Sequence, residues 1–152
     1  NKLPTRYNYN EEESILASLG SFRIQKKNRY GQAIKLNSDS LVLTPNTVLC
    51  ADAVIKSETT IPDAILVFDW RDSTGNSVFW SGSVFKNFIS PDSTYVVSVS
   101  LRIRDLPSIP TAGNIKFYIW KRDDSIIDVK KMEVVSSYLS STEMGLYEPF
   151  NQ

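Results

Sequence analysis

Most of the residue types that carry enzymatic chemistry are missing from this chain. The sequence has no histidine, so it lacks Ser-His-Asp and Cys-His pairs, imidazole zinc sites and every histidine general base. Its one cysteine, Cys50, lies in the run Val-Leu-Cys-Ala-Asp. A lone thiol in such a run is typical of a small buried residue rather than a nucleophile. We therefore expect Cys50 to be buried and inert.

Paired carboxylates are the one hydrolytic chemistry that the composition still allows. A glycoside hydrolase needs two acids that flank a cleft, and Asp52 with Asp69 is the only pair whose spacing suggests adjacent strands. Nothing else in the sequence supports this pairing, and a fold by itself does not imply catalysis. The sequence therefore predicts that the protein is not an enzyme.

Aromatic residues offer a binding chemistry instead, because sugar rings stack on flat aromatic faces beside a few polar groups. Tyr118 and Trp120 share one face of a predicted strand at residues 114–120, and three apolar residues occupy its other face. If the apolar set is in the core, both rings are displayed; the alternative is that they are buried, as aromatic residues in sandwiches commonly are. Trp80 can lie on either side, whereas Trp70 has the parity of a core residue. The candidate ligand-binding residues are Tyr118, Trp120 and Trp80.

Short segments of alternating apolar residues, separated by turn formers, predict strands along most of the chain. The alternation is clearest at residues 95–103, and both faces of residues 47–56 are apolar, as in a central strand. A series of such strands without a long helical period predicts an all-β fold, a two-sheet antiparallel β-sandwich of the jelly-roll kind. The other strands are expected at residues 22–24, 33–36, 41–43, 65–70, 78–80, 114–120, 126–129 and 132–138, with 65–70 and 78–80 forming a hairpin.

The 152 residues fit a single domain with terminal segments. We expect a polar N-terminal segment over residues 1–14, the β-sandwich over 15–138 and a tail over 139–152. The sequence also allows a short helix at residues 11–19. The tail carries Leu146, Tyr147 and Phe150 among polar residues, and it either docks on a surface or frays.

Charge excludes several partner classes. Seventeen basic and seventeen acidic residues give a formal net charge of +0, which removes the bulk attraction behind most nucleic-acid binding. The cluster of Lys26, Lys27 and Arg29 indicates a solvated hairpin end. The longest apolar run, residues 64–68, is far shorter than the roughly 20 residues that span a bilayer. We therefore expect no nucleic acid and no membrane insertion by this chain; the partner is a glycan or a protein.

From residue 95 onward the order of segments is distinctive. An alternating strand is followed by a Leu-Pro loop, the run Asn-Ile-Lys-Phe-Tyr-Ile-Trp, a charged tip at 121–125 and a last strand that includes Met-Glu-Val. This order resembles the C-terminal half of galactose-binding-like jelly rolls, which include many carbohydrate-binding modules, and the turn at 30–33 is compatible with the same family. The resemblance covers about residues 11–134. It implies a non-catalytic accessory domain of an extracellular or cell-surface protein.

The same resemblance implies a structural calcium, which many relatives hold with the help of an Asp-Asp pair. This chain departs from that pattern, because Lys130 and Lys131 stand where the pair should fall. Calcium takes six to eight oxygen ligands, and two ammonium groups repel a cation. Asp128 is near but out of register, and Asp123 and Asp124 are typical turn residues. We therefore expect no cofactor, and a structural calcium is doubtful.

Two functions remain open after these exclusions. Displayed Tyr118 and Trp120 would favour a binding module for carbohydrate. The polar N-terminal segment and the tail would favour a structural or assembly domain that docks on a partner protein in a larger surface or membrane-associated complex.

Overall fold

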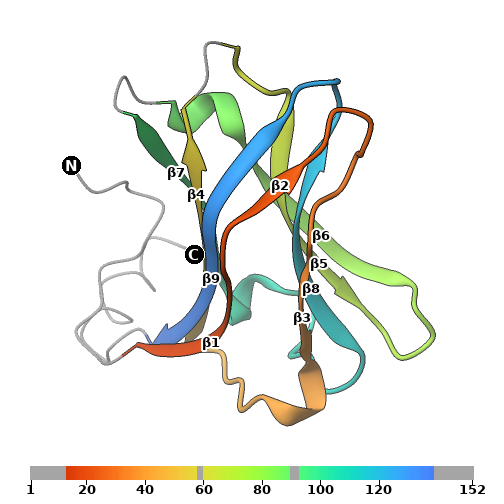
Figure 1. Ribbon diagram of the computed structural model, residues 1–152. Coiled ribbons are helices and arrows are strands. Elements are labelled where there is room, and N and C mark those ends of the chain that lie inside the picture. The colour runs from red at the N-terminus through yellow and green to blue at the C-terminus, as the bar shows by residue number, and fades with distance from the viewer. Residues whose placement is uncertain (1–12, 58–59, 90–92, 139–152) are drawn as a thin grey trace.

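The computed structural model describes residues 13–57, 60–89 and 93–138, which form two antiparallel β-sheets packed face to face (Figure 1). Sheet A contains, in spatial order, β1 (Ser14–Leu19), β9 (Ile127–Tyr138), β4 (Thr47–Lys56) and β7 (Thr94–Arg102), and β2 (Phe22–Ile24) also pairs with β9. Sheet B contains β3 (Ile34–Asn37), β8 (Asn114–Lys121), β5 (Ala64–Arg71) and β6 (Ser77–Val84). The predicted two-sheet jelly-roll sandwich is confirmed.

The core lies between the sheets and is built from one face of each strand. On β4, which pairs with both β7 and β9, Leu49 and Ala51 are fully buried, and Phe68 of β5 and Phe117 of β8 face them from sheet B. The alternation of β7 is as predicted, because every second residue from Tyr95 to Ile103 is buried. Successive side chains of a strand point to opposite faces of its sheet. The outer face of sheet B therefore carries the side chains of its strands that do not enter the core.

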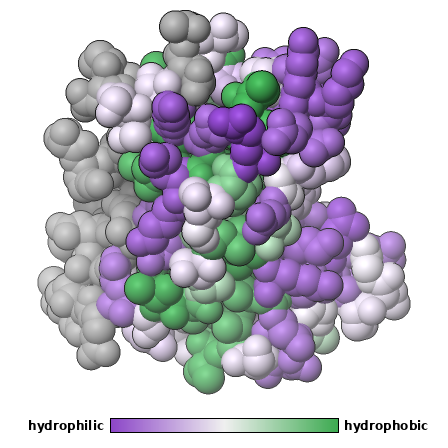
Figure 2. Space-filling model, in the orientation of Figure 1, coloured by the Kyte–Doolittle hydropathy of each residue, from purple (hydrophilic) through white to green (hydrophobic). Residues whose placement is uncertain are grey.

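The surface view shows where apolar residues remain near solvent. In Figure 2 hydrophobic residues gather in the lower centre, over the edge of the sandwich, while hydrophilic residues dominate the right-hand side, where sheet B lies. Leu16, Leu41 and Leu43 are partly buried apolar residues that pack against the core from the first part of the chain. No helix in the described part of the chain is long and apolar enough to cross a membrane.

The prediction of a short helix at residues 11–19 is wrong for residues 13–19, the part of this segment that the structure describes. Residues 14–19 form β1, whose backbone pairs with β9 from Ser14 opposite Ser136 to Leu19 opposite Met132. A segment this short cannot sustain an isolated helix in water, and the ladder to β9 satisfies its backbone groups instead. The predictions for residues 1–12 and for the tail at 139–152 lie outside the described residues.

Two strand predictions also need correction. Residues 41–43 form no strand; they follow the short 3-10 helix η1 (Ser38–Ser40), and Leu41 and Leu43 reach the core from a loop. The two strands expected at 126–129 and 132–138 are one strand, β9. Its register with β4 slips by one residue at Lys130, a bulge that puts both Val129 and Met132 in the core. Simple alternation breaks there, which is why the sequence suggested two strands.

Candidate functional site

The outer face of sheet B carries the rings that the sequence singled out. On β8 the residues Ile115, Phe117 and Ile119 are fully buried in the core, so Tyr118 and Trp120 point to the opposite side of the sheet. Both side chains are partly buried there rather than enclosed. Trp70, by contrast, is in the core as predicted.

Trp80 reaches the same face from β6, with β5 between it and β8. Its side chain is 45% exposed, and its ring centre lies 6.4 Å from that of Trp120 with the planes at 81°. The Trp80 indole passes close to Gly82. A Cβ at Gly82 would lie 3.5 Å from Cη2 of Trp80, an ordinary van der Waals contact, but only 2.5 Å from Cγ2 of Ile65. The two indoles form an edge-to-face pair, which is a favoured aromatic geometry.

Tyr30 is a fourth ring that the sequence did not assign to the site. It comes from the loop between β2 and β3, pairs with Trp120 through an isolated β-bridge, and places its ring 5.7 Å from that of Tyr118. It is 58% exposed. No periodicity marks a single bridging residue, so only the fold could reveal it. We call Tyr30, Trp80, Tyr118 and Trp120 together the aromatic face.

A buried acid anchors the polar part of this surface. Asp69 is fully buried on the outer side of β5, where its carboxylate accepts hydrogen bonds from Arg71 Nε and Ser77 Oγ, both at 2.9 Å. The Tyr118 hydroxyl donates to the same carboxylate at 3.5 Å. A buried carboxylate is stable only when it is paired and hydrogen-bonded, and these donors fulfil that condition. Asp69 thus orients both Arg71 and Tyr118.

The electrostatics of the two neighbours follow from these contacts. The hydrogen bond to Asp69 raises the pKa of Arg71 above its usual value, so the guanidinium stays charged. Burial raises the pKa of Tyr118, and a hydrogen bond with Trp80 opposes the shift. The phenol is therefore neutral at ordinary pH and can donate or accept hydrogen bonds.

An open pocket of about 260 Å³ lies beside the rings. This is near the lower end of the volumes that hold small ligands, roughly 300 Å³ and above. A shallow pocket with one aromatic wall suits a ring that rests on the surface rather than one that is engulfed. The pocket is lined by Tyr30, Gly31, Ala33, Asp69, Arg71, Lys116 and Tyr118.

The carboxylate pair suggested by spacing is wrong, because its members are on different sheets. Asp52 belongs to β4 of sheet A, and Asp69 belongs to β5 of sheet B. Asp52 accepts a hydrogen bond from Ser98 Oγ at 2.5 Å and from the thiol of Cys50 at 3.6 Å. Cys50 itself is buried, as predicted.

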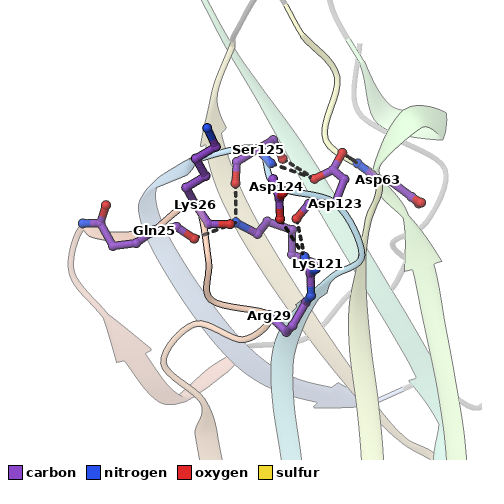
Figure 3. Close-up of polar contacts among 8 residues, drawn as sticks. All are labelled: Gln25, Lys26, Arg29, Asp63, Lys121, Asp123, Asp124 and Ser125. Carbon is purple, nitrogen blue, oxygen red and sulfur yellow. Dashed lines mark hydrogen bonds and ion pairs between the residues drawn. The ribbon is translucent and has the colours of Figure 1, made fainter.

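The last residue of β8, next to the tip between β8 and β9, is a buried lysine (Figure 3). Lys121 is fully buried, and its ammonium donates to the carbonyls of Gln25 at 2.6 Å, Lys26 at 3.1 Å and Ser125. Burial lowers the pKa of Lys121, and the charge of Asp123 opposes the shift. Three carbonyls match the three donors of an ammonium group. Lys121 therefore ties the loop that carries Tyr30 to the β8–β9 tip.

The calcium site that the resemblance implied does not fit the residues at this end of the molecule. Lys130 and Lys131 are exposed cations, and Asp128 is held by Arg23, whose Nε lies 2.6 Å from its Oδ1. Asp123 serves its own turn, where Oδ1 accepts from the backbone of Ser125. Over residues 13–57, 60–89 and 93–138, no group of three or more Cys, Asp or Glu could hold a metal ion. The oxygens needed for calcium are committed elsewhere.

Comparisons with known proteins identify the fold but no family. No protein-family model matches the chain, and no curated protein matches it in sequence. Among solved structures, a chain in the structure of infectious bursal disease virus strain Gx is similar with a TM-score of 0.51 at 8% identity, with 88% of this chain and 34% of that chain covered. The chain thus spans about a third of the viral protein's length.

Carbohydrate-binding modules are also among the similar structures, as the sequence resemblance predicted. One is a module specific for non-crystalline cellulose, at 14% identity, with 82% of this chain and 75% of that chain covered and a TM-score of 0.49. Another belongs to an endoglucanase from Eubacterium cellulosolvens, at 16% identity, with 85% and 100% covered and a TM-score of 0.40. At such identities the likeness concerns the fold alone. The chain is a jelly-roll β-sandwich.

Proposed function

We propose that this protein is a non-catalytic carbohydrate-binding module and that the aromatic face is its ligand-binding surface. The observation that carries the proposal is the meeting of four rings from β8, β6 and the β2–β3 loop on one face of sheet B, with the Trp80 and Trp120 rings 6.4 Å apart. Flat rings beside fixed hydrogen-bonding groups are what sugar rings require.

Polar groups next to the rings support the same function. Tyr118 has a hydroxyl held near Asp69, and Arg71 presents a guanidinium whose side chain is 40% exposed. These groups can bond sugar hydroxyls while the rings provide the stacking contacts. Trp120 is further covered by Arg122, whose guanidinium carbon lies 5.5 Å from the ring centre. This cation–π contact helps to hold the indole in place.

The test is intrinsic tryptophan fluorescence titrated with a panel of soluble polysaccharides. We expect a saturable change in emission, and we expect Trp120→Ala or Trp80→Ala to weaken binding about tenfold or more, as loss of a central aromatic contact does. Trp70→Phe is the matched control, because Trp70 is 5% exposed in the core and cannot touch the ligand. A panel without any saturable change contradicts the proposal.

Docking on a partner protein is the second candidate. Sheet B ends at β6, an edge strand that exposes Val78 at 38% and Trp80 at 45%. Exposed edge strands can pair with another chain. Sedimentation tests the simplest case, in which a second copy is the partner: concentration-dependent association that Trp80→Ala removes would favour assembly over glycan binding.

The proposed module would act outside the cell or at its surface, where polymeric glycans are accessible. This part of the proposal is supported by the resemblance to accessory domains of extracellular proteins and stays a prediction.

A further inference from the structure

Two lysines border the aromatic face on the same row of sheet B. Lys116 of β8 lines the pocket, and Lys35 of β3 stands directly opposite it across the strand pair. Like charges directly opposite each other on neighbouring strands are destabilising. The fold therefore keeps two lysines opposite each other on neighbouring strands at some cost in stability, and of the two only Lys116 lines the pocket.

The neighbouring acids do not neutralise these lysines. Asp69 is opposite Lys116 on the other side, but its carboxylate is engaged with Arg71 Nε and Ser77 Oγ. Asp72 serves its own turn, where Oδ1 accepts from the backbone of Thr74 at 3.0 Å. Within the described residues, neither Lys35 nor Lys116 has a carboxylate at ion-pair distance.

The excess positive charge is local. The whole chain has a formal net charge of +0, so general attraction to polyanions is absent. Lys116 is partly buried and lines the pocket together with Tyr118 and Asp69, and screening by salt is weaker there than on an open surface. A lysine in this lining can meet an anion that binds in the pocket beside the Tyr118 ring.

We infer that the glycan recognised by the aromatic face is acidic: its sugar ring stacks at Tyr118, and its carboxylate or sulfate group lies against Lys116, with Arg71 in the same pocket and Lys35 on the neighbouring strand. This inference rests on the proposed function, since it names the class of sugar that the same surface would select. The neutral hydroxyl groups of an unmodified glucan would leave the ammonium of Lys116 without a counter-charge.

The experiment compares polymers that differ only in charge. Binding of polygalacturonate is measured against its methyl ester, and binding of dextran sulfate against dextran, by isothermal titration calorimetry. For the charged member of one pair we expect about fivefold or greater preference, the size of a single partly exposed ion contact. The pair that shows the preference identifies the anion as carboxylate or sulfate.

Lys116→Gln removes the charge and keeps most of the side chain. It should weaken binding of the charged polymer about fivefold and thereby abolish the preference over the neutral polymer. Lys130→Gln is the matched control, because Lys130 is an exposed lysine on β9 of the other sheet, and it should change neither affinity. Raising the salt concentration should shrink the preference in the wild-type protein.

The outcomes separate this inference from the proposed function. Equal binding of charged and neutral polymers, unaffected by Lys116→Gln but lost in Trp120→Ala, overturns the acidic-glycan inference and leaves glycan binding intact. A panel in which no polymer binds overturns both.

Discussion

At the scale of single residues, Asp69 and Lys121 are charged side chains that the fold buries completely. Both survive burial because their hydrogen-bonding capacity is filled: the carboxylate by Arg71, Ser77 and Tyr118, and the ammonium by three backbone carbonyls. Each of them positions part of the candidate site. Asp69 orients Tyr118, and Lys121 holds the loop that contains Tyr30.

Replacing Lys121 should show how much that loop depends on one side chain. Lys121→Met keeps the aliphatic stem but leaves the carbonyls of Gln25, Lys26 and Ser125 without their donor. We expect the free energy of unfolding to fall by about 2–3 kcal/mol, the cost of leaving such groups unsatisfied. Urea denaturation measures the change.

The control for this substitution is Lys130→Met, which removes an exposed ammonium group and should change stability by less than about 0.5 kcal/mol. Hydrogen exchange in residues 25–30 should also accelerate in Lys121→Met, because the loop loses its tie to β8. Equal stability of the two variants would show that water replaces the ammonium group without penalty.

At the scale of secondary-structure elements, β5 sets the separation between Trp120 on β8 and Trp80 on β6. It separates β8 from β6, so Trp120 and Trp80 are two strands apart, and the Trp80 indole passes close to Gly82. A methyl group on Gly82 would clash with Ile65, which is the cross-strand partner of Trp120.

Gly82→Ala should therefore disturb packing and, through the displaced Ile65, the position of Trp120 in the ring pair. Its Cβ would lie 2.5 Å from Ile65 Cγ2 and 3.1 Å from the carbonyl oxygen of Leu66, so we expect about 1–3 kcal/mol of destabilisation. The circular dichroism signal from coupling of the Trp80 and Trp120 indoles should weaken. Gly20→Ala is the control, since nothing lies within 4 Å of its Cβ. An unchanged dichroism signal in Gly82→Ala would contradict this account of the ring geometry.

At the scale of the whole molecule, the two sheets share one core and should unfold together. Phe68 of sheet B is fully buried, with its ring centre 5.3 Å from that of Phe117. Phe68→Ala should lower the free energy of unfolding by about 3–5 kcal/mol. Cys50 of sheet A provides an independent probe, because its buried thiol reacts with a labelling reagent only when the protein opens.

If the sandwich is one cooperative unit, Phe68→Ala should accelerate labelling of Cys50 by the same factor as it raises the unfolding equilibrium constant. Ser73→Ala, in an exposed loop, is the control and should leave the labelling rate unchanged. If Phe68→Ala left the labelling rate of Cys50 unchanged, sheet A would open independently of sheet B.

The fold class followed from the sequence because alternation of apolar residues reports directly which face of a strand is buried. The same rule assigned Trp70 to the core and Tyr118 with Trp120 to the opposite side of β8. It failed where alternation was interrupted: at the bulge of Lys130, and at 14–19, where pairing with β9 rather than local preference determines the strand.

Long-range contacts decided the rest. Tyr30 joins the aromatic face through a bridge to a residue 90 positions later, and Lys121 meets carbonyls about 95 residues earlier in the chain. Asp52 and Asp69, close in sequence, were separated onto different sheets by the strand order. Local pattern specifies which side of a strand a residue faces, but the pairing of strands determines its neighbours, since pairing depends on the packing of the complete core.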